Sequence, residues 1–332
     1  MSATTAGTLP GGAGRVWRGI AASEAGPIYG VLLLVALVSW IVILATGGQV
    51  NVTTTLVRSV ALGIVAVGQT LVILGGSLDL SVAYQVSVTA VMASYVMDGD
   101  PNRMWLGVAA VIGIGIAIGL ANGLIITGLG VNAFITTLGT GLILRGVLNA
   151  SFDNFAGEVP REFQSLGYDE LGPIPYSVLL FAAVVLIAWI ILRLTRFGHH
   201  LYAVGGSEET ARLSGVRSAR VLIGAHVLCS LTAVLTGLFI VSRLRAGAPW
   251  VGPDGNYDLE SIAAVVLGGT ALAGGRGGVL GTVAGVLILA LLDNLFNQLE
   301  VNTFLKDILR GVIIVAAVAV YALRGGQLRR SA

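Results

Sequence analysis

The sequence predicts an all-α membrane protein, a polytopic bundle of about ten transmembrane helices, some of them short or broken. Two observations predict this class. Of 332 residues, 55% are hydrophobic and 11% are charged, whereas about 25% of residues are charged in soluble domains. Apolar runs of about 18 residues or more also recur along the chain, which is the length needed to cross a bilayer. Lipid is therefore expected to solvate most of the surface.

Ten apolar spans are expected between the two termini. In chain order they are Ile28–Ala45, Leu56–Gly76, Leu80–Met97, Met104–Ile126, Val131–Ala150, Tyr176–Leu194, Val221–Val241, the short Leu259–Leu272, Gly278–Asn297 and Ile308–Leu323. The first is too long for a typical signal-peptide core and has no clean cleavage site, so we expect it to be retained. Residues 1–27 and 324–332 are expected to be tails of the membrane domain 28–323, the first of them disordered.

The distribution of arginine predicts which side of the membrane each connection faces, since positive residues of short loops stay in the cytoplasm. The connection 195–220 carries four arginines, the C-terminal tail three and the N-terminal tail two. Ten spans place all three segments on the cytoplasmic side. The connection 151–175 carries five acidic residues and one arginine, so it is expected outside. Arg243 and Arg245 also fall outside in this scheme and are its one local disagreement.

Polar side chains inside the apolar runs are the candidates for lining a solute path. An ionisable or amide group at bilayer depth costs on the order of 2–3 kcal/mol and normally faces protein or water. The candidates are Gln69, Asp79, Ser81, Asn122, Thr137 and Arg145. Thr137 and Arg145 share one helix face. That face is either a pore wall, or a hydroxyl bonded to its own helix and an arginine that reaches the outer interface.

The segment GGSLDLS, residues 75–81, is expected to interrupt a helix. It lies in the run Val60–Met97, whose roughly 38 residues would extend ~57 Å as one helix, close to two bilayer thicknesses. Two roles are open for Asp79 and Ser81. They cap the exposed amides of the next span, or they line a path beside unwound backbone.

Glycines at four-residue spacing are expected to bring helices into close contact, because they let two backbones approach. They are Gly115, Gly119 and Gly123 in the fourth span and Gly277, Gly281 and Gly285 in the ninth. Helix packing is the favoured role, and a face toward substrate is the alternative. An internal echo, LGGSLDLS at 74–81 and LGGTALAG at 267–274, is consistent with a repeat or with chance in a chain of 47 glycines.

A short helix is expected inside the cytoplasmic connection. In SEETARLSGV, Ser207 suits an N-cap, Glu208 and Glu209 the first turn, and Gly215 the position after the C-cap. A helix of about two turns is marginal alone. It is therefore either ordinary loop structure or a surface held by a partner.

Several classes of function are disfavoured by composition. The small net charge of +2 has no dense basic block, so nucleic-acid binding is not expected. One cysteine and three histidines make a metal site improbable. No phosphate-binding GxxxxGKS or GxxxxGKT motif occurs, so no bound cofactor is expected on this chain. An intramembrane enzyme would need a nucleophile, a metal or a carboxylate pair that the sequence does not offer.

Four ordered segments resemble the permease subunit of ATP-driven (ABC) importers for ribose, xylose, arabinose, galactose and related monosaccharides. They are GQTLVILGGSLDLSV, VNAFITTLGTGLILRGV, YAVGGSEETARLSGV and LESIAAVVLGGTALAGGRGGVLGTVAGVLI. The resemblance covers the chain from about Val57 to Leu323. It implies the ABC importer permease architecture in a bacterial inner membrane.

The resemblance also implies partners. A separate ATP-binding subunit that holds ATP and Mg²⁺ would dock on the cytoplasmic face, an extracytoplasmic sugar-binding protein would dock outside, and a second permease copy would complete the pore. The family's coupling segment, which seats on the ATPase, corresponds here to Gly205, Gly206, Ser207, Glu208, Glu209, Ala211, Arg212, Leu213 and Gly215.

The alternative function is a self-powered secondary transporter or channel for a small polar solute. In that case Asp79 would be a proton or cation site. The cytoplasmic coupling segment favours the ATP-driven importer.

Overall fold

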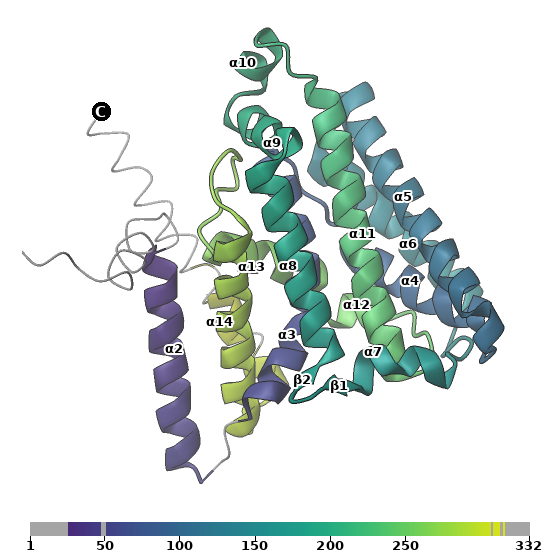
Figure 1. Cartoon of the computed structure of the whole chain (residues 1–332), viewed down its shortest axis with the longest axis vertical. Coiled ribbons are helices and arrows are strands. Elements are labelled where there is room, and N and C mark those ends of the chain that lie inside the picture. The colour runs from purple at the N-terminus through teal and green to yellow at the C-terminus, as the bar shows by residue number, and fades with distance from the viewer. Residues whose placement is uncertain (1–25, 48–50, 307, 313–314, 316–332) are drawn as a thin grey trace, which may run out of the picture.

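The computed structural model describes residues 26–47, 51–306, 308–312 and 315, and most of this part is helical (Figure 1). The membrane-embedded elements are α2 (Gly26–Ala45), α3 (Val52–Leu74), α4 (Val82–Met97), α5 (Met104–Gly128), α6 (Ala133–Ser151), α8 (Tyr176–Leu194), α11 (Ser218–Leu244), α13 (Tyr257–Leu267) and α14 (Val279–Gln298). Shorter elements connect them: η1 (Pro101–Arg103), η2 (Arg161–Gln164), α7 (Ser165–Tyr168), the antiparallel pair β1 (Glu170–Leu171) and β2 (Ile174–Pro175), α9 (Arg196–Gly206), α10 (Glu208–Leu213) and α12 (Val251–Asp254).

The all-α polytopic class is confirmed. Seven described helices are long and apolar enough to cross a bilayer, and α4 is a shorter apolar helix. The predicted eighth span, Leu259–Leu272, is wrong in extent, because α13 stops at Leu267 before two glycines. Its 11 residues rise only ~16 Å, about half of a bilayer core. Both expected tails, apart from Gly26 and Pro27, and most of the span Ile308–Leu323 lie outside the described residues.

Helices α3 and α11 form the centre of the molecule. In the most apolar 18-residue stretch of α3, 83% of the residues are buried, whereas only 11% are buried in the corresponding stretch of the peripheral α2. The α2 helix packs along α14 at one edge, where the Tyr29 hydroxyl donates to the Leu280 carbonyl (3.0 Å; Figure 1). Large apolar side chains such as Leu33 and Leu186 point outward. A bundle with an apolar exterior of this kind is suited to lipid.

Two helices end in the same way where the sequence shows its internal echo. After α3, Gly76 takes φ +78°, its amide donates to Ile73 (2.9 Å), and the Ser77 amide donates to Val72 (3.1 Å). After α13, Gly269 takes φ +86° and, with Thr270, repeats both bonds at 2.9 and 3.1 Å. Each end is therefore a Schellman motif, in which a left-handed glycine turns the chain out of the helix. The two similar sequence segments, 74–81 and 267–274, therefore share the backbone geometry with which their helices end.

Glycines hold the central helices at backbone contact distance. A Cβ built on Gly119 of α5 would lie 2.7 Å from the Val227 Cα of α11. Gly115 and Gly123 also face α11. A Cβ on either Gly281 or Gly285 of α14 would come within 2.1 Å of a carbonyl oxygen of α13 or its C-cap.

The expectation for Gly277 is wrong, because this residue lies in the loop before α14. Its φ of +120° is incompatible with a helix, so it cannot share the helix face of Gly281 and Gly285. Four-residue spacing alone does not distinguish a helical glycine from one that forms a turn.

The connections gather at two opposite ends of the bundle (Figure 1). The α9–α10 segment lies at one end, whereas α7, the β1–β2 pair and α12 lie at the other. Arg243 and Arg245, the local disagreement in the arginine count, lie at the second end over the ring of Tyr168, whose hydroxyl donates to the Arg243 carbonyl (2.7 Å). Contact with an aromatic face and a loop gives both arginines a local partner there.

We expect Gly119→Ala to destabilise the protein, because the new methyl group overlaps the backbone of α11. Overpacking of this kind costs about 1–3 kcal/mol. The control is Gly113→Ala on the outer face of the same helix, where a Cβ meets nothing within 4 Å. Thermal denaturation in detergent should show a lower midpoint for Gly119→Ala and an unchanged or higher one for Gly113→Ala. Equal midpoints would contradict the packing role.

Candidate functional site

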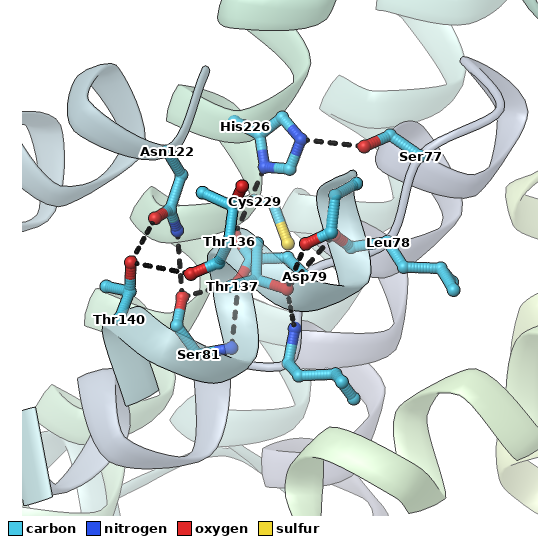
Figure 2. Close-up of polar contacts among 12 residues, drawn as sticks. Ser77, Leu78, Asp79, Ser81, Asn122, Thr136, Thr137, Thr140, His226 and Cys229 are labelled. Atoms are coloured by element: carbon cyan, nitrogen blue, oxygen red, sulfur yellow. Dashed lines mark hydrogen bonds and ion pairs between the residues drawn. The ribbon is translucent and has the colours of Figure 1, made fainter. Parts of the chain in front are cut away.

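The unwound segment 75–81 lies in the interior of the bundle, between the ends of α3 and α4. Backbone outside a helix has unpaired amides and carbonyls, which an apolar environment tolerates only if the protein supplies partners. Polar side chains from α5, α6 and α11 converge on this segment (Figure 2), and Gln69 of α3 joins them. This cluster is the candidate functional site.

Asp79 is the charged group at the centre of the cluster, and it is fully buried. One carboxylate oxygen accepts from the amide (2.9 Å) and the hydroxyl of Ser81, and the other lies 3.3 Å from His226 Nδ1. His226 Nε2 lies 2.9 Å from the Ser77 hydroxyl (Figure 2). With the ring proton on Nδ1, the imidazole donates to Asp79 and accepts from Ser77. A buried carboxylate with these donors avoids the cost of an unpaired charge.

The Ser81 hydroxyl connects Asp79 to the neighbouring helices. It donates to Asp79 and accepts from Gln85 Nε2 (2.7 Å) and from Asn122 Nδ2 (3.0 Å). Because a hydroxyl has one proton and two lone pairs, all of its bonding capacity is used. Asn122 in turn accepts from Thr140 of α6 (2.7 Å). The break is thereby joined to α5 and α6.

Gln69 and Thr137 satisfy the unwound backbone itself. With the Gln69 amide oriented to pair donors with acceptors, its nitrogen donates to the Asp79 carbonyl (3.2 Å) and its oxygen accepts from the Asp79 amide (3.3 Å). The Thr137 hydroxyl accepts from the Leu80 amide (3.1 Å) and donates to Ala133 of its own helix (2.8 Å). Both side chains therefore take the place of missing helix hydrogen bonds.

Five of the six predicted path residues meet here: Gln69, Asp79, Ser81, Asn122 and Thr137 are all fully buried. Arg145 does not belong to the cluster. It is exposed on the outer surface of α6, two turns from Thr137. Thr137 and Gly141 of the predicted stripe are buried against the protein, whereas Arg145 one turn further along is exposed.

Sequence reasoning missed His226, Ser77, Gln85 and Thr140. His226 is an ionisable residue inside an apolar run, so the rule that selects Asp79 also selects His226. Gln85 is an amide inside the expected span Leu80–Met97, so the same rule selects it, and Ser77 lies in the predicted break 75–81. Thr140 is a common polar residue whose position carries no distinguishing sequence signal.

The cluster is closed in this structure. None of its residues lines either of the two outer cavities, and within the described residues no group of three His, Cys, Asp or Glu side chains is placed to hold a metal ion. The hydrogen bonds among these side chains hold the non-helical segment 75–81 in place, and we call this cluster the polar lock. Asp79 accepts the amide of Ser81, the residue directly before α4, and the Ser81 side chain makes no cap bond to the helix.

A wide cavity opens at the end of the molecule that carries α7 and α12. Its volume is about 810 Å³. Its lining combines aromatic rings, such as Trp250 and Tyr257, with charged side chains, such as Arg58 and Asp254. Phe155 and Trp250 meet edge to face at its margin (5.1 Å between ring centres).

A smaller cavity of about 230 Å³ adjoins the wide one and shares Arg58, Asp254 and Tyr257 with it. Arg310 pairs here with Glu260 (2.8 Å) and with Asp293. Convergent polar groups beside aromatic surface are typical of small-molecule sites.

The opposite end carries the predicted coupling segment. The α10 helix begins as expected at an N-cap Ser207, whose hydroxyl accepts from the Thr210 amide (3.3 Å), and has Glu208 and Glu209 in its first turn. It ends in a Schellman motif in which Gly215 takes φ +83°. Only Ala211 is buried in α10, while the remaining predicted residues Glu208, Glu209, Arg212 and Leu213 are exposed.

The segment before α10 differs from the expectation. Gly205 and Gly206 are not in a loop but close the 11-residue helix α9. The sequence RFGHHLYAVGG mixes three glycines with polar and apolar residues and gives no clear helical signal. Its Leu201 and Val204 are buried, so packing forms this helix where intrinsic propensity is low.

We expect Ser81→Ala to destabilise the protein by about 2–3 kcal/mol, because it leaves the buried amides of Gln85 and Asn122 without an acceptor. Ser177→Ala is the matched control, since the Ser177 hydroxyl is also buried but has no hydrogen-bond partner in the described part of the chain. Thermal unfolding in detergent compares the two variants. If the unfolding midpoint fell no further for Ser81→Ala than for Ser177→Ala, the stabilising role of the Ser81 hydrogen bonds would be contradicted.

Comparisons with known proteins identify the family. The family model described as "Branched-chain amino acid transport system / permease component" matches residues 51–318. The ribose import permease protein of Escherichia coli K12 is 40% identical over 266 residues, covering 77% of this chain and 81% of that protein. The L-arabinose transport system permease protein of the same organism is 37% identical, covering 77% of each chain.

A third relative is the galactose/methyl galactoside import permease protein of Haemophilus influenzae, 31% identical over 83% of this chain and 87% of that protein. No solved structure matches the chain. The resemblance inferred from the four sequence segments is confirmed by these relatives. The chain is therefore a member of this family of membrane permease components.

Proposed function

We propose that this chain is the permease subunit of an ATP-driven importer that passes a monosaccharide from an extracytoplasmic binding protein to the cytoplasm. A separate subunit would hydrolyse ATP, and a second permease copy would complete the pore. The observation that carries the proposal is α10, a short capped helix exposed at one end of a membrane bundle.

The shape of α10 suits a docking element. Six residues are too few for an isolated helix to be stable in water, and caps at both ends offset part of that cost. Ala211 anchors one side, while Leu213 is 81% exposed beyond the membrane-spanning helices. An apolar side chain beside Glu208, Glu209 and Arg212 gives the mixed surface typical of a protein contact.

The energy source would lie outside this chain. The sequence has no lysine-bearing phosphate loop, and the glycine-rich segment 268–278 is a turn between α13 and α14. ATP and Mg²⁺ are accordingly proposed to bind to the partner subunit, and α10 to receive the force.

A monosaccharide is the proposed substrate class, although the family model's description names branched-chain amino acids. The relatives reported above are import proteins for ribose, arabinose and galactose. The wide cavity also fits a sugar, because rings such as Trp250 and Tyr257 can cover its C–H faces while Arg58 and Asp254 bond its hydroxyls.

The proposed orientation places α10 and both termini in the cytoplasm of a bacterial cell and the wide cavity outside the inner membrane. It follows from the arginine count and from the separation of α10 and α7 at opposite ends (Figure 1). A binding protein would then dock at the end that carries the acidic connection 151–175.

The decisive experiment is uptake into proteoliposomes that contain this chain, its genomically neighbouring ATPase and its neighbouring binding protein. We expect uptake of a radiolabelled monosaccharide, dependent on ATP inside and on the binding protein outside. Leucine uptake would identify the amino-acid alternative. Uptake driven by an ion gradient without the ATPase would identify a secondary transporter and contradict the proposal.

Variants of α10 test the docking role. Glu209→Arg and Leu213→Asp are each expected to reduce co-purification of the ATPase about tenfold or more, because each changes an exposed contact residue of a small interface. Leu171→Asp is the control, since Leu171 is exposed in β1 at the opposite end. Undiminished co-purification of both α10 variants would contradict docking through α10.

A further inference from the structure

Three glycine-bearing segments from distant parts of the sequence meet where α3 ends and the non-helical segment 75–81 begins. They are Leu74–Gly76 at the end of α3, Gly205–Gly206 at the end of α9, and Gly274–Gly275 in the loop before α14. We call this contact the glycine junction. It is a contact of backbone with backbone, since the Gly275 amide donates to the Leu74 carbonyl (3.0 Å).

At Gly205, Gly274 and Gly275 the junction leaves no room for a side chain, whereas a Cβ on Gly206 would meet nothing within 4 Å. A Cβ on Gly205 would lie 1.8 Å from the Leu74 oxygen and 2.6 Å from the Gly275 nitrogen. A Cβ on Gly274 would lie 2.8 Å from the Gly76 nitrogen, and one on Gly275 would lie 2.7 Å from the Gly206 Cα. With no flexible side chain between the three segments, none of them can move inward without displacing another.

The junction lies between the two features that the proposed function connects. On one side, Gly205 is separated by one residue from Ser207, the N-cap of α10. On the other, Gly76 directly precedes Ser77, which contacts His226 and through it Asp79. The path from α10 to the polar lock is therefore one continuous chain of backbone contacts and buried hydrogen bonds.

A second contact ties α9 to the same loop. The hydroxyl of Tyr202, three residues before Gly205, donates to the carbonyl of Gly277, two residues after Gly275 (2.8 Å). Displacement of α9 thus acts on the loop at two points.

We infer that the glycine junction transmits displacement of α10 to the break between α3 and α4, with Gly205 as the positioning residue. This inference rests on the proposed function, because it needs a force applied at α10. It assigns a role in coupling to residues that touch neither solute nor nucleotide. Gly205 acts by letting α9 touch Leu74 and Gly275 directly.

Gly205→Ala tests the inference. The added methyl group would lie 1.8 Å from the Leu74 oxygen, so it must push α9 away from Leu74 by about 1.6 Å to reach the ordinary contact distance of 3.4 Å. In proteoliposomes with the ATPase and binding protein, we expect the number of sugar molecules imported per ATP hydrolysed to fall about fivefold or more. The ATPase should still co-purify, because α10 keeps its own surface and caps.

The imported-to-hydrolysed ratio separates transmission from simple loss of stability. A variant with fewer folded molecules loses transport and stimulated ATP hydrolysis together, and its ratio stays at the wild-type value. Gly128→Ala is the control, since Gly128 ends α5, is exposed and has nothing within 4 Å of a built Cβ. Its ratio should equal that of the wild type.

Tyr202→Phe is a second test variant for the case in which Gly205→Ala does not assemble with the ATPase. It removes one hydroxyl and leaves the ring packing in place, and we expect a smaller fall of the same ratio. A wild-type ratio in assembled Gly205→Ala would overturn the inference, as would a wild-type ratio in Tyr202→Phe when Gly205→Ala fails to assemble. Absence of ATP-driven uptake in the wild type would instead refute the proposed function.

Discussion

The rest of this structure depends on one constraint: a helix that unwinds inside an apolar bundle must find partners for its freed backbone groups within the protein. The segment 75–81 finds them in Gln69, Thr137 and Asp79, which belong to α3, to α6 and to the segment itself. Asp79 in turn requires His226, and Ser81 requires Asn122. The hydrogen bonds that satisfy the backbone of segment 75–81 thus fix the relative positions of α4, α5, α6 and α11.

The many glycines serve two separate purposes around this constraint. Gly76 and Gly269 have positive φ and turn the chain out of a helix. Gly119 and Gly285 are helical and have no side chain because another backbone lies where the side chain would be. At the glycine junction both purposes occur within a few ångströms, since Gly274 and Gly275 turn the loop while Gly205 permits the contact. Composition alone could not distinguish these roles.

Much of the fold was predictable from the lengths of apolar runs, and the break was predictable because one run was too long for a single crossing. The cluster around Asp79 was also predictable, since the energetic cost of polar groups in lipid applies wherever they occur. Three errors have physical causes. Periodicity did not reveal that α6 presents Arg145 outward, spacing did not reveal the φ of Gly277, and α9 forms through packing of Leu201 against the core.

Gly205 shows why contact, and not conformational freedom, accounts for a glycine at the junction. It is the last residue but one of α9, and in a helix interior a glycine is less favourable than alanine by about 1 kcal/mol. Its backbone is helical, so alanine could adopt the same conformation and would be favoured if only α9 mattered. The cost is offset by the approach to Leu74 and Gly275, which alanine forbids. A helix is therefore weakened at the residue where it must touch the break, directly before the segment exposed to a partner.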